Sequence, residues 1–157
     1  MKKALLFAGL WVSAILGFEY LANAVINLVY GSTTISEFVR LILGIVLLLT
    51  AVLGIVLMTK ALKKKDEGSA FSVPSVLLLV CAAIVVLGYM PVQIVEAARG
   101  ISYYSNPDND LYGPGPEVSE LFIKLNMIYI VIAHIEGLTV AALTVFSLVK
   151  PEEKKRN

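Results

Sequence analysis

Carboxylic acids, amides and tyrosines interrupt a long apolar segment near the start of this sequence, where they could bind protons, ions or a polar ligand. At about 100° per helical residue, five of them fall within an arc of about 100°. They are Glu19, Tyr20, Asn23, Asn27 and Tyr30. Ionisable groups are costly inside a membrane and mark binding or proton-transfer sites there. The spacing therefore predicts one polar helix face, with Glu19 as its acid.

Two later apolar segments carry comparable groups. By the same rotation, Tyr89, Gln93 and Glu96 share a face of about 60° on one helix. Tyr129 and Glu136 are seven residues apart and share a face on another helix. The pattern predicts that polar faces from three helices meet inside one bundle.

These groups also match in depth. Counted inward from the predicted outer ends at about 1.5 Å per residue, Glu19, Tyr89, His134 and Glu136 reach one level, about 15 to 18 Å down. Amides lie above this level, and the segments below it are almost wholly apolar. We therefore expect a polar funnel that opens outward and is closed on the cytoplasmic side. Its candidate ligand-binding or proton-binding residues are Glu19, Asn23, Asn27, Tyr89, Gln93, Glu96, His134 and Glu136.

A structural role is the alternative for part of this set. Polar side chains also tie membrane helices together, at about 0.6 kcal/mol per hydrogen bond, and Asn23, Asn27 and Gln93 suit that role. A buried carboxyl group must instead be protonated or paired. His134 could be the partner of Glu19. Arg40 is expected to pair with Glu37 near the outer surface.

The remaining composition argues against an enzyme. The chain has one histidine and one cysteine, which exclude bis-histidine haem ligation and a disulfide within the chain. Zinc motifs, a phosphate-binding loop and a nucleophile elbow are missing from the sequence. We therefore predict no catalytic residue, no metal site and no cofactor. The net charge of +1 gives no electrostatic basis for binding nucleic acid.

Four long apolar stretches must position the polar groups. They cover about residues 4–30, 35–62, 71–99 and 117–149, and each exceeds the roughly 20 residues that cross a bilayer as a helix. Hydrophobic residues make up 58% of the 157 positions. The sequence therefore predicts an all-α membrane protein, with residues 1–157 as a single four-span domain. Short hinges favour an antiparallel four-helix transmembrane bundle.

Local signals refine this fold. Thr34 and Glu37 have capping-box spacing, which predicts that the second helix starts near Ile35. Gly44 and Gly54 offer positions for close helix contact. Pro91 lies inside the third span and is expected to bend the helix there.

Basic residues predict the orientation. Ten of the 13 lysines and arginines lie at the two termini and in the hinge from Lys60 to Lys65, and three (Arg40, Arg99 and Lys124) lie on the other side. The positive-inside rule then places both termini and this hinge in the cytoplasm. Short loops and the lack of a glycosylation sequon favour a prokaryotic plasma (inner) membrane.

Three functions fit this description. A glutamate in the first of four spans is similar to the small multidrug transporters, but the similarity covers Glu19 alone and identifies no family. We expect first a non-enzymatic subunit of a larger respiratory or transport-related membrane complex, in contact with lipid and with other subunits or its own copies. The alternative is a small proton- or ion-coupled transporter or channel that uses Glu19 and the funnel. A quinone-site accessory protein would use His134, Tyr129 and Glu136 as proton groups.

Overall fold

The computed structural model describes residues 1–29, 34–64, 72–95, 98 and 120–149, and these residues form helices and no strand. The helices are α1 (Lys2–Val29), α2 (Ile35–Lys64), α3 (Ser72–Ala83), the π-helix η1 (Ile84–Tyr89) and α5 (Glu120–Val149). After η1 the chain is α-helical again over residues 90–95. The predicted all-helical fold is confirmed for this part of the chain.

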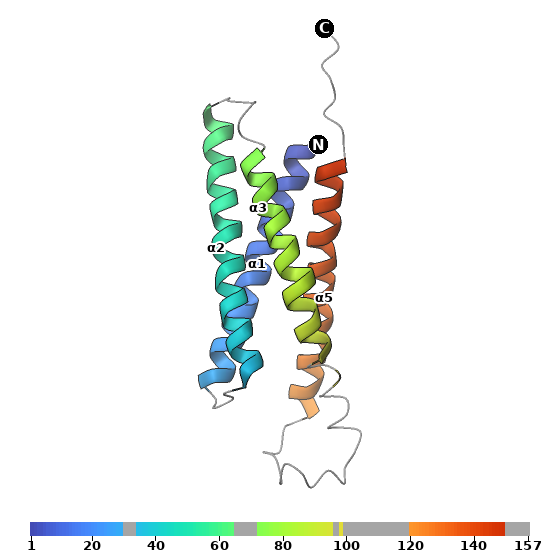
Figure 1. Ribbon diagram of the computed structural model, residues 1–157. Coiled ribbons are helices and arrows are strands. Elements are labelled where there is room, and N and C mark those ends of the chain that lie inside the picture. The colour runs from blue at the N-terminus through green and yellow to red at the C-terminus, as the bar shows by residue number, and fades with distance from the viewer. Residues whose placement is uncertain (30–33, 65–71, 96–97, 99–119, 150–157) are drawn as a thin grey trace.

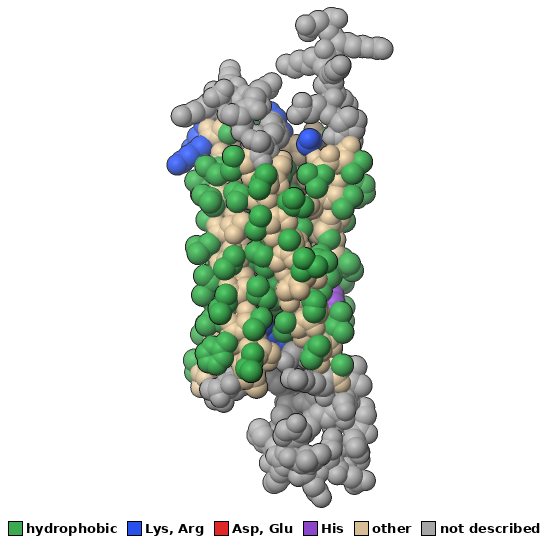
Figure 2. All heavy atoms as spheres, in the orientation of Figure 1, with side chains coloured by type: hydrophobic (Ala, Val, Ile, Leu, Met, Phe, Trp, Pro, Cys, Tyr) green, Lys and Arg blue, Asp and Glu red, His purple; other side chains and the backbone are tan. Residues whose placement is uncertain are grey.

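Four helical segments are long and apolar enough to cross a membrane. They are Lys2–Val29, Ile35–Lys63, Val73–Val95 and Met127–Val149, found among the described residues. Large apolar side chains face outward from all of them, and Figure 2 shows hydrophobic groups over the visible face between the two ends. Such a surface would aggregate in water but suits lipid.

The four segments lie side by side, and α1 crosses behind α3 and then behind the lower part of α2 in Figure 1. In the apolar part of each span, 44% of the residues of α1 are buried, which is the largest fraction of the four, and 22% of those of α5, which is the smallest. The helix that carries Glu19 is therefore the most enclosed, and its polar face must meet other helices.

Glycines set the distance between α1 and α2. A Cβ on Gly44 would lie 3.0 Å from the backbone nitrogen of Leu21, and one on Gly54 would lie 2.7 Å from Leu10 Cδ2. The predicted close contacts at both glycines are confirmed. Gly17 of α1 makes a third close contact, since a Cβ added to it would lie 2.8 Å from the backbone nitrogen of Leu48. The lack of side chains lets the two backbones approach closely.

Apolar side chains fill the end of the bundle where α1 begins. One buried cluster comprises Leu6, Leu10, Met58, Leu78, Ala82 and Val140. Three buried hydroxyl groups near this end bond to their own helices, with Ser13 donating to Gly9, Thr144 to Val140 and Ser147 to Thr144. These three hydroxyl groups thus donate their hydrogen bonds within their own helices.

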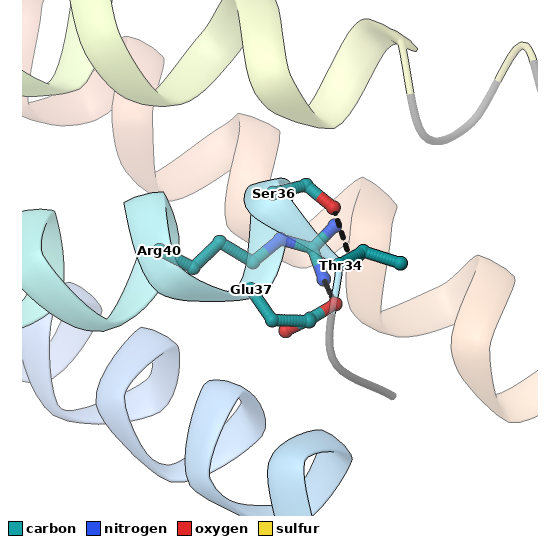
Figure 3. A network of polar contacts seen from close by, with 4 residues as sticks. All are labelled: Thr34, Ser36, Glu37 and Arg40. Atoms are coloured by element: carbon teal, nitrogen blue, oxygen red, sulfur yellow. Dashed lines mark hydrogen bonds and ion pairs between the residues drawn. The ribbon is translucent and has the colours of Figure 1, made fainter. Parts of the chain in front are cut away.

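The second helix begins at Ile35, as predicted. The capping contacts differ from a capping box. The Thr34 hydroxyl bonds the Ser36 hydroxyl at 2.8 Å, while the Glu37 carboxylate accepts a hydrogen bond from Arg40 (Figure 3). Because Glu37 turns toward Arg40, its side chain serves an ion pair instead of the helix terminus.

The third span widens into η1 directly before Pro91. The Met90 N–H bonds the Val85 carbonyl, five residues back, so the regular α-helical ladder is interrupted where the proline predicts. In an uninterrupted α-helix, at about 100° per residue, Gln93 would be rotated about 80° from Val85. A π-helical turn takes more residues, which reduces this rotation. Val85, Tyr89 and Gln93 accordingly all face the interior and are at most 2% exposed.

Candidate functional site

One cluster of polar side chains lies inside the bundle, and all four spans contribute to it. We call it the polar cluster. Its members are Glu19, Tyr20 and Asn23 of α1, Glu37 and Arg40 of α2, Tyr89 and Gln93 of the third span, and Tyr129 and Glu136 of α5. The sequence reasoning predicted that polar faces of three helices meet, and the structure adds α2 as the fourth.

The carboxyl groups of Glu19 and Glu136 face each other, within hydrogen-bonding range if one of them carries a proton. Both lie well within their spans. Glu136 is the tenth of 23 residues in Met127–Val149, and Glu19 is the eighteenth of 28 in Lys2–Val29. Two carboxylates at such a distance repel in a medium of low dielectric constant, and one shared proton removes the repulsion. This arrangement can therefore hold and release a proton.

Tyrosines surround the carboxyl pair. The rings of Tyr20 and Tyr89 are in contact with each other at 50°, and the Gln93 side chain lies against the Tyr20 hydroxyl. Tyr129 lies beside Glu19 and Asn23. Hydroxyl and amide groups can both donate and accept hydrogen bonds, so this shell can adapt to either charge state of the pair.

Arg40 and Glu37 belong to the polar cluster, although the sequence analysis expected them to pair near the outer surface and did not include them in the site. Their predicted pairing is confirmed, since Arg40 Nη1 lies 2.9 Å from Glu37 Oε1 (Figure 3). Both side chains are nearly fully buried, however, and the charge of Arg40 acts electrostatically on Tyr20, Tyr89 and Tyr129. The missed signal was an arginine only five residues into an apolar helix, whose long side chain can reach inward.

Buried polar atoms without a hydrogen-bond partner occur together in the polar cluster. Among the described residues they include Glu19 Oε2, Glu136 Oε2, Tyr89 Oη, Tyr129 Oη and Gln93 Nε2. A buried polar group without a partner costs about 1–3 kcal/mol. The hydroxyls at the other end of the bundle are satisfied within their own helices. Within the described part of the chain, the unmet hydrogen-bonding capacity is thus confined to one place, which is the property of a binding site.

The remaining candidates lie outside this arrangement or outside the described residues. His134 Nδ1 donates to the Ile130 carbonyl of its own helix at 2.8 Å, and Glu136 instead of His134 stands beside Glu19. Asn27 is half-buried on α1. Glu96 is not among the described residues. The polar cluster therefore rests on Glu19, Asn23, Tyr89, Gln93 and Glu136 from the predicted set.

Comparison with models of protein families, with curated proteins and with solved structures finds no match to this chain. The chemistry of the site is consequently argued from its geometry alone. It comprises two facing carboxyl groups, a neutral shell of hydroxyls and amides, and one buried ion pair.

Proposed function

We propose that the protein is a small proton-linked transporter, with Glu19 and Glu136 as a shared proton-binding site. The observation that carries the proposal is the facing of these two carboxyl groups from different spans, each with one buried oxygen atom that lacks a partner. Substrate and coupling-ion sites of transporters commonly lie near the bilayer midplane. The position of the pair inside its spans fits such a site.

The distribution of polar groups supports this function. The polar cluster continues from the pair toward the end where α2 begins, through Asn23, Gln93 and Arg40. In the opposite direction the bundle is filled by the apolar cluster around Leu10 and Leu78. The solute would enter from the end of the bundle where α2 begins. The opposite end, which the apolar cluster fills, would have to open to release it.

Proton flux in liposomes tests the proposal. The purified protein is reconstituted into liposomes that contain a pH-sensitive dye, and a potassium diffusion potential, negative inside, draws protons inward. We expect faster acidification than in empty liposomes. Glu19→Gln and Glu136→Gln should each lower the rate by about a hundredfold, because positioned acid–base groups contribute about that much to proton transfer.

Thr144→Ala is the control, because the Thr144 hydroxyl donates to the Val140 carbonyl of its own helix at 2.7 Å. It should leave the flux unchanged. Wild-type protein that acidifies liposomes no faster than empty membranes would overturn the proposal. Infrared spectra recorded at several pH values add a second measurement, since the protonated carboxyl band should change in both glutamine variants, each of which has lost one carboxyl group of the pair.

The bundle is proposed to be antiparallel, with both termini in the cytoplasm of a prokaryotic cell. Contacts between α1 and α2 support the direction, since Leu10, Gly17 and Leu21 meet Gly54, Leu48 and Gly44 in turn. Residue numbers rise along one helix as they fall along the other. The distribution of basic residues supports the cytoplasmic side. On this orientation the polar cluster opens outward.

A non-enzymatic subunit of a larger membrane complex is the second candidate. The low buried share of the α5 span, 22%, favours it, because a partner could cover this helix. Purification in a mild detergent distinguishes the two. Stoichiometric co-purification of other membrane proteins supports the subunit, and an isolated chain or homo-oligomer that moves protons supports the transporter.

A further inference from the structure

The atoms around the Glu19–Glu136 pair are hard oxygen ligands. Two carboxyl groups face each other, and the hydroxyl of Tyr129 lies beside Glu19 with Asn23 next to it. Glu19 Oε2, Glu136 Oε2 and Tyr129 Oη are all buried and have no hydrogen-bond partner. Carboxylate, hydroxyl and amide oxygens are the ligands of hard metal cations.

The charges of the polar cluster indicate how much positive charge a bound ligand must supply to neutralise it. Four charged side chains contribute to the polar cluster, and Glu37 and Arg40 neutralise each other at 2.9 Å. Glu19 and Glu136 then leave two negative charges, or one when they share a proton. An uncompensated charge in an apolar interior is very costly. One proton together with one monovalent cation makes the pair neutral, as do two protons.

Tyr89 and Gln93 give independent evidence that the cluster receives a ligand. Their side chains are 0% and 2% exposed, and Tyr89 Oη and Gln93 Nε2 lack partners. The Tyr89 hydroxyl interacts electrostatically with Tyr20, Tyr129, Arg40 and Glu19. A hydroxyl buried in this way costs free energy unless something in the cluster accepts or donates a hydrogen bond. A hydrated or partly hydrated ion supplies such groups.

The ligand set favours a monovalent metal over a divalent one. No three His, Cys, Asp or Glu side chains of the described chain come together as a metal site. When the two carboxyl groups share one proton, a single negative charge remains, and one monovalent cation neutralises it.

We propose that Glu19, Glu136 and the Tyr129 hydroxyl bind one alkali-metal cation of sodium size, which competes with a proton for the carboxyl pair. The inference rests on the proposed function, since it names the ion that the proton-binding site would exchange. The other titratable, charged and amide groups of the polar cluster are Tyr20 and Asn23 from α1, Arg40 with Glu37 from α2, Tyr89 and Gln93 from the third span, and Tyr129 from α5.

Binding of radioactive sodium to the purified full chain in mild detergent tests this site. N-methylglucamine chloride keeps the ionic strength constant. We expect one sodium ion per chain at alkaline pH. The apparent dissociation constant should rise about tenfold for each unit by which the pH falls, because a proton competes with sodium. Glu19→Gln, Glu136→Gln and Tyr129→Phe should each weaken binding at least about tenfold, and Thr144→Ala should not. Three variants keep the test valid if one of them fails to fold.

Each remaining outcome decides against the inference. Sodium binding that persists in both glutamine variants would place the ion elsewhere. Binding of tetraethylammonium without sodium would assign the pair to an organic cation. Absence of sodium binding, combined with a carboxyl band that still titrates and with proton flux, would overturn the cation site and leave the proposed function intact. If wild-type protein shows no proton flux, the proposed function is disproved instead.

Discussion

Gly17 of α1 lies against the backbone of α2, so that a Cβ on it would be 2.8 Å from the nitrogen of Leu48. Two residues further along α1 is Glu19, whose side chain is half-buried and faces Glu136. The close contact at Gly17 therefore holds the segment that presents the carboxyl group. Its replacement should disturb both the packing and the site.

We predict that Gly17→Ala destabilises the protein by about 1–3 kcal/mol, the typical cost of overpacking. The added methyl group meets backbone, which moves only if the two helices separate. Gly54→Ala is the matched control, because its Cβ meets the end of the Leu10 side chain at 2.7 Å, which can change rotamer. Denaturation by sodium dodecyl sulfate, followed by circular dichroism, measures both. Equal losses in the two variants would contradict this account.

The spans and the close glycine contacts could be predicted from the sequence, because both follow from residue type along one helix. Long apolar runs determine a membrane-crossing helix, and Gly44 permits contact wherever the helix meets a neighbour. The start of α2 at Ile35 was predictable as well. The contacts at the start of α2 could not be predicted. The Glu37 carboxylate could accept a hydrogen bond from the helix terminus or from Arg40, and in the structure it accepts one from Arg40.

We predict that Arg40→Leu destabilises the protein by about 3–5 kcal/mol, the usual cost of breaking a buried ion pair from one side. Glu37 would then be a buried carboxylate without its cation. The double variant Glu37→Leu/Arg40→Leu should recover most of the loss, because neither charge remains buried. Both are compared with the wild type in the same denaturation experiment. A double variant less stable than Arg40→Leu alone would contradict the prediction.

The composition of the site could be predicted only in part. The stripe on α1 gave Glu19 and Asn23 because α-helical rotation is regular there. In the third span the π-helix η1 changes the rotation, and a proline indicates an irregularity without giving its form. His134 and Glu136 are two residues apart on α5. Their different contacts follow from which side chain turns back to its own helix, and His134 does so at Ile130.

We predict that the segment around Ser105 is external and that the hinge at Ser69 is cytoplasmic, because ten of 13 basic residues lie on the side of this hinge. Both serines lie outside the described residues. In a Cys81→Ala background, a cysteine at Ser105 should react with an impermeant thiol reagent on intact cells. A cysteine at Ser69 should react only after the cells are opened. The reverse pattern would invert the bundle and direct the polar cluster toward the cytoplasm.

We predict that Glu19 and Glu136 are energetically coupled, because their carboxyl groups face each other across α1 and α5. In Glu19→Gln or Glu136→Gln, the new amide can donate a hydrogen bond to the remaining carboxylate, so each single variant should fold. The double variant loses this charge-assisted bond. A double-mutant cycle on the free energy of unfolding should therefore give a coupling of about 0.5–3 kcal/mol.

The matched cycle pairs Glu19→Gln with Thr144→Ala. The Thr144 hydroxyl donates to the Val140 carbonyl of its own helix. Residues without a shared partner should be additive to within about 0.3–0.5 kcal/mol. If the glutamate cycle is equally additive, the two carboxyl groups do not interact, and no proton or cation can be shared between them. Coupling in the glutamate cycle alone would instead show that the two spans communicate through this pair. That is the property a carrier needs if the loading of one site is to bias the packing of two helices.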